Sequence, residues 1–364
     1  MTAPRFSLDA IEVHAEGEPG RIITNAAGLV DGATMAERFA FCRDHLDGLR
    51  RAILREPRGY PGLCAVFLLP PVNQGSDFGI VVLEQGGFTP MSGSNTMCAV
   101  TAAIETGIVG ITGPETQVVI DTAIGTVRAI AHVDGPKVTA VTVANVPSWV
   151  VALDAPLQVQ EFGEVRADIV FGGQFFVQAR AADLGIELHA EAAKQITRAG
   201  SLLRAAAPPQ FPVQHPENPD IDQVALTMLH GPSPTPGVSG RNAVVLPNGE
   251  VDLADPDSWT GSLDRSPCGT GTSGRMAALH ARGELAPEVP FVHEGILGTT
   301  FTGAVRGTTP VGEREAVLPS ISGRGWITGY AQLVLDDTDP FPQGYVLGDI
   351  WGPDATVELV EVER

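Results

Sequence analysis

The chain has 364 residues, of which 43% are hydrophobic, and it contains 42 glycines and 29 prolines. A chain of this length and composition can bury a core in each of two globular lobes. Its 43 acidic and 23 basic residues give a formal net charge of −20. No Lys/Arg cluster interrupts that charge, and we therefore exclude nucleic acid as a partner.

The sequence predicts no targeting or membrane-spanning segment. Residues 1–18 lack the apolar core of a signal peptide, and the most apolar stretch, LCAVFLLPPV (63–72), is too short to span a bilayer. The four cysteines have neither CxxC spacing nor the density of a disulfide scaffold, which predicts free thiols; they are Cys42, Cys64, Cys98 and Cys268. We expect a cytoplasmic protein with no membrane partner.

In chain order, short β-type runs alternate with Gly/Pro turns. Runs typical of strands are FGIVVLE, TQVVIDT, VTAVTVANV and AQLVLD. The segments of helical length are 34–55, 96–106, 188–206 and 272–282. This mixture predicts an α+β fold. Two Pro-rich segments, 205–220 and 229–240, are expected to be long surface loops within a domain.

The sequence contains an internal repeat. SGSNTMCAVTAAIETG from Ser92 aligns with CGTGTSGRMAALHARG from Cys268 at an offset of 176 residues, and DTAIGT from Asp121 parallels EGILGT from Glu294. The similarity extends through a turn, a helix and the strand that follows. We therefore predict a duplicated lobe.

Each copy of the repeat predicts a Gly-containing turn that leads into a helix. Thr96 or Thr272 lies near the start of the helix, and Gly107 or Gly283 ends it in the left-handed conformation. The free N–H groups and the dipole at each helix start favour an anion. If the lobes face each other, both starts can bind one carboxylate, which suggests a pocket for a small amino or imino acid.

Cys268 is the candidate reactive residue. It lies between Pro267 and Gly269-Thr270-Gly271, where helix amides would lower a thiol pKa from about 8.5 toward the range of reactive cysteines. A thiolate at this position could act as a base. The alternative interpretation is a small buried apolar residue. The other three cysteines lie in apolar patterns and are assigned to the core.

Six further motifs follow one another along the chain, and they are HAEGEPGR (14–21), MSGSNT (91–96), FGGQFF (171–176), DRSPCGTGTS (264–273), GTTFTG (298–303) and WITGYAQLVLDDTDPF (326–341). Together and in this order they resemble the proline racemase family, which includes proline racemase, 4-hydroxyproline epimerase and trans-3-hydroxy-L-proline dehydratase.

The resemblance implies an α+β fold of two pseudo-symmetric lobes. Each lobe is a mixed β-sheet or barrel wrapped around a central helix, as in diaminopimelate epimerase, with the active site in the interlobe cleft. The N-terminal lobe is predicted over 1–138, with the C-terminal tail 340–364 returning to it. The C-terminal lobe is predicted over 139–339.

The resemblance also implies the site residues. Two residues facing opposite sides of the substrate Cα move its proton, and both are cysteines in racemases. Here Ser92 replaces the first cysteine, Ser94 replaces a histidine, and the second cysteine is Cys268. Asp264 would bind the ring nitrogen. Backbone donors to the carboxylate would come from Gly93, Ser94, Gly269 and Thr270. Neither a metal nor another cofactor is implied.

The serine at position 92 favours one activity of the family. Racemisation needs a competent base on both faces of Cα, and a hydroxyl is a much weaker acid than a thiol. In trans-3-hydroxy-L-proline the α-hydrogen and the hydroxyl share a face, so one residue could serve both. We therefore predict a trans-3-hydroxy-L-proline dehydratase that forms Δ1-pyrroline-2-carboxylate. The alternatives are a 4-hydroxyproline 2-epimerase or proline racemase, and an inactive imino-acid-binding protein.

Some features stay open at the level of sequence. The substrate is expected to be hydroxyproline or proline, and a homodimer is one option for the assembly. Trp259 in DLADPDSWTG (252–261) could either cover a substrate ring or anchor a loop, and His14 is expected to be structural.

Overall fold

The computed structural model describes residues 5–219, 221–247, 249–336, 338–348 and 350–351, and it divides into two compact units. Unit 1 comprises Met1–Val143 and Arg324–Arg364, and unit 2 comprises Ala144–Gly323. Each unit is described by itself. The return to unit 1 starts earlier than the predicted residue 340, because strand β18 (Gly325–Asp336) pairs antiparallel with β1 (Arg5–Ala15). Residues 352–364 of the predicted tail lie outside the described residues.

Unit 1 is built on a mixed sheet in the order β18-β1-β2-β3-β4-β6-β7-β8, with β5 on the edge of β4. The pairs β2/β3 and β4/β6 are parallel, and the other pairs are antiparallel. The remaining strands are β2 (Glu18–Ile23), β3 (Cys64–Leu69), β4 (Phe78–Glu84), β5 (Gly87–Thr89), β6 (Glu115–Thr122), β7 (Gly125–Asp134) and β8 (Lys137–Ala144).

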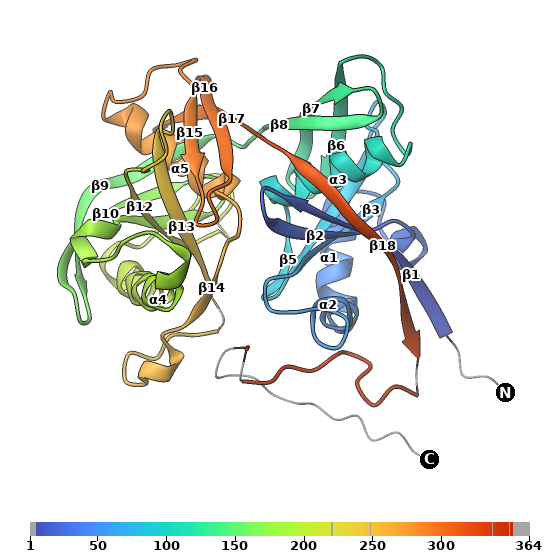
Figure 1. Ribbon diagram of the computed structural model, residues 1–364, viewed down its shortest axis with the longest axis horizontal. Helices are drawn as coiled ribbons and strands as arrows, with labels where there is room; N and C mark the ends of the chain where they lie inside the picture. Colours follow the sequence, from blue (N-terminus) through green and yellow to red (C-terminus); the bar gives the residue numbers. More distant parts are fainter. Residues whose placement is uncertain (1–4, 220, 248, 337, 349, 352–364) are drawn as a thin grey trace. The chain divides into compact units, whose positions relative to one another are not determined.

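The helices of unit 1 lie on both faces of this sheet (Figure 1). They are η1 (Ala26–Leu29), α1 (Met35–His45), α2 (Asp47–Leu54) and α3 (Gly93–Glu105). Helices α1 and α2 cover one face through apolar residues such as Cys42 and Ile53, which pack in one cluster with Phe67 of β3. Helix α3 is buried along nearly its whole length, because its sequence is small or apolar on every side.

Unit 2 is a closed barrel in the order β9-β10-β11-β12-β13-β15-β16-β17, in which β17 pairs back with β9. Its strands are β9 (Ser148–Val159), β10 (Gly163–Phe171), β11 (Phe175–Arg180), β12 (Val224–Gly231), β13 (Gly240–Pro247), β14 (Gly261–Leu263), β15 (Phe291–Glu294), β16 (Thr300–Val311) and β17 (Arg314–Gly323). Its helices are η2 (Ala181–Leu184), η3 (Ala190–Ala192), α4 (Ala193–Gln210), η4 (Pro256–Ser258) and α5 (Gly269–Ala281).

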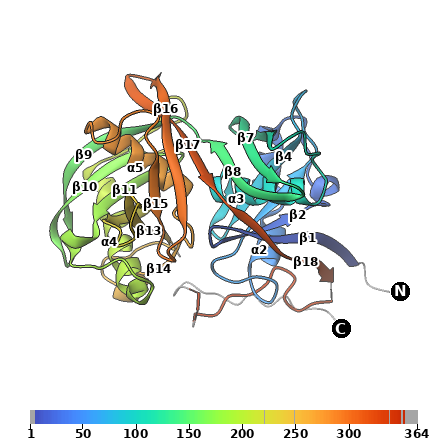
Figure 2. The same ribbon diagram turned by 45° about the horizontal axis from the view of Figure 1, so that its top comes forward.

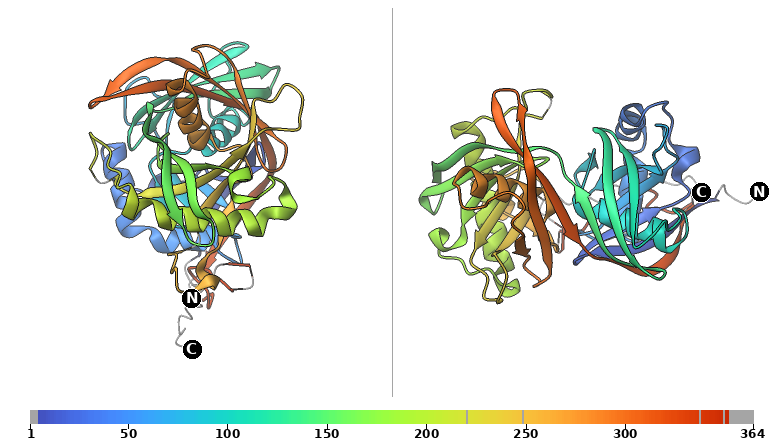
Figure 3. Two further views of the ribbon diagram at one scale, coloured as in Figure 1. Left: turned by 90° about the vertical axis from the view of Figure 1, so that its left-hand side faces the viewer. Right: turned by 90° about the horizontal axis from the view of Figure 1, so that it is seen from above.

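The barrel of unit 2 separates two helices. Helix α5 lies among the strands, whereas α4, yellow-green in the bar colours, lies on their outside (Figures 2 and 3). Successive side chains of a strand point to opposite faces, so alternate residues of β11 pack on the side of α4 and on the side of α5. Phe175 and Val177 of β11 belong to the outer core with α4, and Phe176 belongs to a smaller cluster with Cys268 and Ala278.

The two units confirm the predicted duplication. Helices α3 and α5 each have 13 residues and follow the N-cap residues Ser92 and Cys268. The strand pattern also repeats, because the pairing of Gly79 with Asp121 has its counterpart in that of Arg241 with Glu294. As predicted, each helix is followed by a left-handed glycine, Gly107 at φ 76° and Gly283 at φ 73°.

The predicted helices differ from the observed ones mainly at their ends. The segment 34–55 is broken at Leu46, which lies outside helical φ/ψ, and α1 begins with a capping box between Thr34 and Glu37. Helix α4 runs into the segment 205–220 predicted to be a loop. Two prolines fit into its last turn, because bonds from Phe211 to Ala207 and from the Gln210 side chain to Ala206 still close that turn. Among the described residues, no helix has the length and apolar character required to cross a membrane.

Candidate active site

Cys268 is held in an unusual backbone conformation at the start of α5. It is the N-cap residue, with φ 59° and ψ 108°, and only 5% of its surface is exposed. Residues other than glycine seldom adopt positive φ, and such strain collects at functional sites. The neighbouring structure must therefore hold this residue in place.

A short polar chain connects Asp264 to the backbone of Cys268. Both the N–H and the hydroxyl of Ser266 donate to Asp264 Oδ1, at 2.8 Å each, and the Cys268 N–H donates to Ser266 Oγ at 3.1 Å. The backbone N–H of Asp264 donates to the Val244 carbonyl on β13. The motif DRSPC thus forms a buried turn that places the carboxylate and the thiol together. Sequence reasoning missed Ser266, although the spacing of Asp and Ser at i and i+2 is a known turn signal.

The environment of the Cys268 thiol corrects one prediction. Burial raises its pKa well above the ordinary value, and the negative charge of Asp264 raises it further. Hydrogen bonds from Thr270 and from the Gly271 N–H, which lies 3.4 Å from Sγ, act in the opposite direction but are outweighed. The expected fall of the pKa at the helix start is therefore wrong for the protein without ligand. This environment therefore favours the uncharged thiol over the thiolate.

The FGGQFF motif supports the first turn of α5. A Cβ on Gly172 would lie 2.1 Å from the Thr270 carbonyl oxygen and 2.7 Å from the Gly274 nitrogen, so only glycine permits this close approach. Asn145 then binds both the Gly172 carbonyl and the Ser273 hydroxyl, at 3.2 and 2.8 Å. The motif is therefore a packing surface for the helix that carries Cys268.

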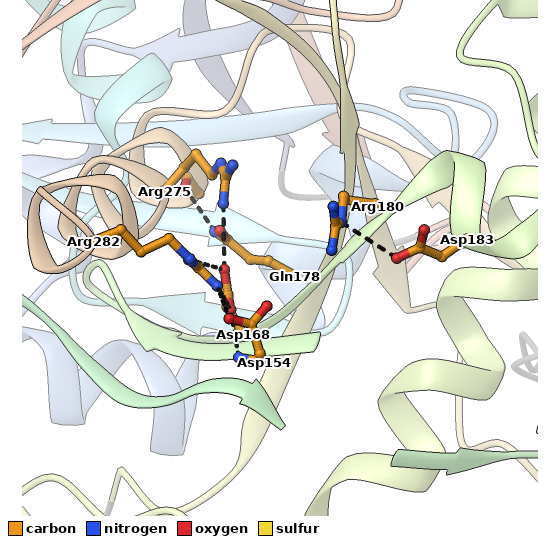
Figure 4. Close-up of polar contacts among 8 residues, drawn as sticks. Asp154, Asp168, Gln178, Arg180, Asp183, Arg275 and Arg282 are labelled. Carbon is orange, nitrogen blue, oxygen red and sulfur yellow. Dashed lines mark hydrogen bonds and ion pairs between the residues drawn. The ribbon is translucent and has the colours of Figure 1, made fainter. Parts of the chain in front are cut away.

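Polar side chains of the barrel wall fix the rest of α5 (Figure 4). Gln178 on β11 donates to the Gly271 carbonyl at 3.0 Å. The Asp168 carboxylate on β10 receives two hydrogen bonds from Arg282, at 2.7 and 2.8 Å, and one from Arg275 at 3.3 Å. Because Asp168 is 4% exposed, these bonds are shielded from solvent.

Ser92 occupies the corresponding N-cap position in unit 1. Its backbone is extended, with φ −143°, and its side chain makes no capping bond to the helix. The Asn95 amide donates to Ser92 Oγ at 3.1 Å, and Ser94 Oγ lies 3.5 Å from the same atom. Since Ser92 Oγ accepts from Asn95, its own proton remains available for a second partner. Asn95 is a further residue that the sequence analysis missed.

Both helix starts present backbone donors. Gly93 and Ser94 open α3, and Gly269 and Thr270 open α5. The N–H groups of a first helical turn precede any acceptor within the helix. Each unit therefore offers a buried set of donors that is suited to a carboxylate. The structure places six of the seven predicted site residues at these two helix starts, and the seventh, Asp264, lies beside the second.

The other candidates have structural roles. His14 accepts from the Gly17 N–H at 3.1 Å and stacks on Trp326, as expected of a structural histidine. Trp259 is buried, donates to the Asp252 carbonyl and lies under the guanidinium of Arg198, so it anchors its loop. All four cysteines are buried and free. Within the described ranges, no three His, Cys, Asp or Glu side chains form a group that could hold a metal ion.

Asp121 and Glu294 have equivalent roles in the two units. Asp121 accepts from the N–H groups of Val72 and Asn73, which form the loop before β4. Glu294 accepts from the hydroxyls of Ser233 and Thr235 in the loop before β13. Each buried carboxylate therefore fixes the same loop of its copy.

These features define a duplicated α+β protein with a hydroxyl at the helix start of one copy and a thiol at the helix start of the other. A family model described as proline racemase matches residues 10–346. A 4-hydroxyproline 2-epimerase of Streptosporangium roseum is 38% identical over 93% of this chain and 98% of its own length. A trans-3-hydroxy-L-proline dehydratase of Burkholderia ambifaria and a 3-hydroxyproline 2-epimerase of Burkholderia multivorans are each 35% identical, over 94% of this chain and 98% of theirs.

The fold has a close match among solved structures. The crystal structure of a probable proline racemase from Agrobacterium radiobacter, with bound carbonate, has a TM-score of 0.86. It is 33% identical, with 96% of this chain and 99% of that chain covered. The chain belongs to the proline racemase family, whose members include isomerases and dehydratases.

Proposed function

We propose that this protein is a trans-3-hydroxy-L-proline dehydratase. The observation that carries the proposal is the chemical difference between the two N-cap residues, a hydroxyl at Ser92 and a thiol at Cys268. A thiol can act as both base and acid near neutral pH far more readily than a hydroxyl. This asymmetry suits a reaction that uses one face of the substrate.

In the proposed complex, one substrate molecule contacts both helix starts. The ring ammonium pairs with the Asp264 carboxylate, and the substrate carboxylate accepts hydrogen bonds from Gly93, Ser94, Gly269 and Thr270. Support comes from the burial of Asp264 beside the thiol and from the helix-start donors, which favour an anion. Pairing with a cation offsets the negative charge that raises the Cys268 pKa, so substrate binding itself promotes thiolate formation.

The proposed chemistry needs only Cys268 as base and acid. The thiolate removes the α-proton, and the electrons of that C–H bond form a double bond between Cα and C3. The C3–O bond breaks with its electron pair on oxygen, and the new Cys268 thiol returns the proton to this oxygen, which leaves as water. The enamine product then tautomerises to Δ1-pyrroline-2-carboxylate. The thiolate is regenerated without any oxidant or cofactor.

A second candidate is 4-hydroxyproline 2-epimerase or proline racemase activity. It is favoured by the Asn95 hydrogen bond, which leaves the Ser92 proton free to be donated to a carbanion on the opposite face. Exchange in both directions would then require Ser92 to act as a base, which a hydroxyl does poorly. We therefore place this activity second.

The experiment that tests the proposal is product analysis by proton NMR in D₂O. The purified protein is incubated separately with trans-3-hydroxy-L-proline, trans-4-hydroxy-L-proline and L-proline, and the Cys268→Ser variant is the control. Pyrroline-2-carboxylate from the 3-hydroxy substrate alone supports the dehydratase. Deuterium at an inverted Cα in the other two substrates would instead establish an epimerase or racemase. No turnover, combined with substrate binding seen by calorimetry, would favour an inactive imino-acid-binding protein.

A further inference from the structure

A buried histidine contacts the turn that holds Cys268. His293 lies on β15, is 1% exposed, and its Nδ1 lies 2.8 Å from Thr272 Oγ1 in the first turn of α5. The same hydroxyl lies 3.0 Å from the carbonyl oxygen of Pro267, the residue before Cys268. A linear path of two hydrogen bonds therefore connects the histidine ring to the Pro267–Cys268 peptide.

The protons along this path can be assigned by elimination. A carbonyl oxygen only accepts, so the contact between Thr272 and Pro267 uses the single hydroxyl proton of Thr272. Thr272 Oγ1 must then accept a proton from His293 Nδ1. Burial, together with His230 and Arg275, lowers the pKa of His293 well below its ordinary value and so favours the neutral ring. A neutral ring with a proton on Nδ1 has none on Nε2.

The other copy of the repeat provides an internal comparison. The sheet register places Ile120 of unit 1 where unit 2 has His293. There the hydroxyl of Thr96, the counterpart of Thr272, donates to the Ser92 carbonyl at 2.7 Å, which is an ordinary bond back along the helix. Ser92 is extended, whereas Cys268 has positive φ. The copy that has the histidine is therefore the copy with the strained N-cap.

We propose that His293, in its Nδ1–H form, is a positioning residue that acts through Thr272 and the Pro267 carbonyl to hold Cys268 in its left-handed conformation. Asn242 on β13 supports the same carbonyl, since its amide donates to Pro267 O at 3.0 Å. The catalytic part of this inference rests on the proposed role of Cys268 as the base. The structural part does not depend on it.

The tautomer is tested first, by long-range ¹H–¹⁵N correlation spectra of the full-length protein labelled with ¹⁵N-histidine. The signals of His293 are identified among those of the eight histidines by their loss in His293→Asn. We expect a protonated Nδ1 and an unprotonated Nε2. A proton on Nε2 would overturn the inference, and this measurement needs no turnover.

The positioning role is tested with paired variants. Thr272→Val removes the hydroxyl at constant shape and Thr272→Ser keeps it, while His293→Leu removes the ring donor and His293→Asn retains an N–H near the Nδ1 position. We expect Thr272→Val and His293→Leu to lower kcat by about 10- to 100-fold with little change in KM, because the thiol is misplaced but the binding groups remain. Thr272→Ser and His293→Asn should recover most of the rate.

The control is Thr227→Val. Thr227 is equally buried, and its hydroxyl donates to the Gly200 carbonyl at 2.8 Å, a bond that does not reach the Cys268 turn. An equal loss of kcat in this variant would mean that any buried threonine matters, and would overturn the proposal. The double variant of His293→Leu and Thr272→Val should be no slower than either single variant, because both substitutions interrupt the same path of hydrogen bonds.

A separate readout keeps the inference testable if the proposed activity fails. Site-resolved mass spectrometry follows the alkylation of Cys268 by iodoacetamide in each variant. We expect several-fold faster alkylation in Thr272→Val and His293→Leu, since a relaxed turn exposes the thiol, and the wild-type rate in Thr227→Val. Wild-type alkylation rates in all variants would show that the hydrogen bonds from His293 through Thr272 to Pro267 do not hold Cys268 in place. If Thr272→Val and His293→Leu do not fold, the inference is tested by the rates of Thr272→Ser and His293→Asn and by the tautomer of His293.

Discussion

Ser92 and Cys268 hold the same N-cap position in the two copies of the repeat, but their φ angles are −143° and 59°. One difference between the two copies lies in the residues before the helices. Unit 2 has Asp264 and Ser266 in a hydrogen-bonded turn, whereas the residues 176 positions earlier are Phe88 and Pro90, which cannot form it. Duplication thus preserved the helix start, and divergence gave the two N-cap residues different chemical environments.

Replacing Ser92 should move the activity between reaction types. We expect Ser92→Cys to gain inversion at Cα of L-proline with uptake of solvent deuterium, because a second thiol supplies the missing base. Ser92→Ala should keep dehydration within about tenfold of wild type, since Cys268 performs both proton transfers. Proton NMR in D₂O measures both. Complete loss of dehydration in Ser92→Ala would contradict the one-sided mechanism.

Removing the Cys268 thiol should abolish turnover and leave the fold intact. We expect Cys268→Ser to lose at least about 10²-fold in kcat, because a hydroxyl does not replace the thiol as base and acid. Cys42→Ser, in the apolar core of unit 1, is the matched control and should stay active. Initial rates and circular dichroism provide the measurement. A substantial residual rate in Cys268→Ser would remove this residue from the role of base.

The pH dependence should follow the thiol. Burial and the charge of Asp264 raise the Cys268 pKa, so the thiolate fraction is small at pH 7 and grows with pH. We therefore expect kcat/KM to rise between about pH 7 and 9. A flat profile would argue that another group is the base.

Asp264→Asn isolates the electrostatic part of this shift. Removal of the negative charge should lower the Cys268 pKa, and the alkylation profile of Cys268 should move to lower pH. Mass spectrometry across about pH 6 to 10 measures this without substrate, so the loss of a substrate contact does not interfere. An unchanged profile would mean that burial alone sets the pKa.

Gly172→Ala should disturb the start of α5. Its Cβ would lie 2.1 Å from the Thr270 carbonyl oxygen, so the backbone must shift, and we expect a loss of about 1–3 kcal/mol in the free energy of unfolding together with reduced turnover. Gly28→Ala, where no atom lies within 4 Å of the new Cβ, should change stability by less than about 0.5 kcal/mol. Urea unfolding compares the two variants. Equal stability would show that the strands adjust freely around α5.

The ionic contacts along α5 should contribute to the stability of unit 2. Asp168→Asn removes the carboxylate of Arg275 and leaves Arg282 with only the exposed Asp154, and we expect a loss of about 3 kcal/mol in the free energy of unfolding. Asp44→Asn is the control, because its bond to Arg43 is exposed and should contribute nothing measurable. A wild-type unfolding midpoint for Asp168→Asn would mean that water replaces the carboxylate.

The sequence by itself determined the local features of this protein. The repeat, the two glycines that end α3 and α5, and the position of Ser92 and Cys268 at helix starts all follow from short patterns, and local backbone preferences suffice to produce them. The DRSPC turn is also local, since Asp264 and Ser266 are two residues apart.

Only the tertiary structure decided what surrounds these helix starts. His293, Gln178 and Asp168 come from three different strands and meet α5 only when the barrel closes, so no spacing along the chain indicates their contacts. The direction of the Cys268 pKa shift also depended on closure. Helix amides alone would lower it, but burial inside the barrel and the nearby Asp264 carboxylate favour the uncharged thiol more strongly.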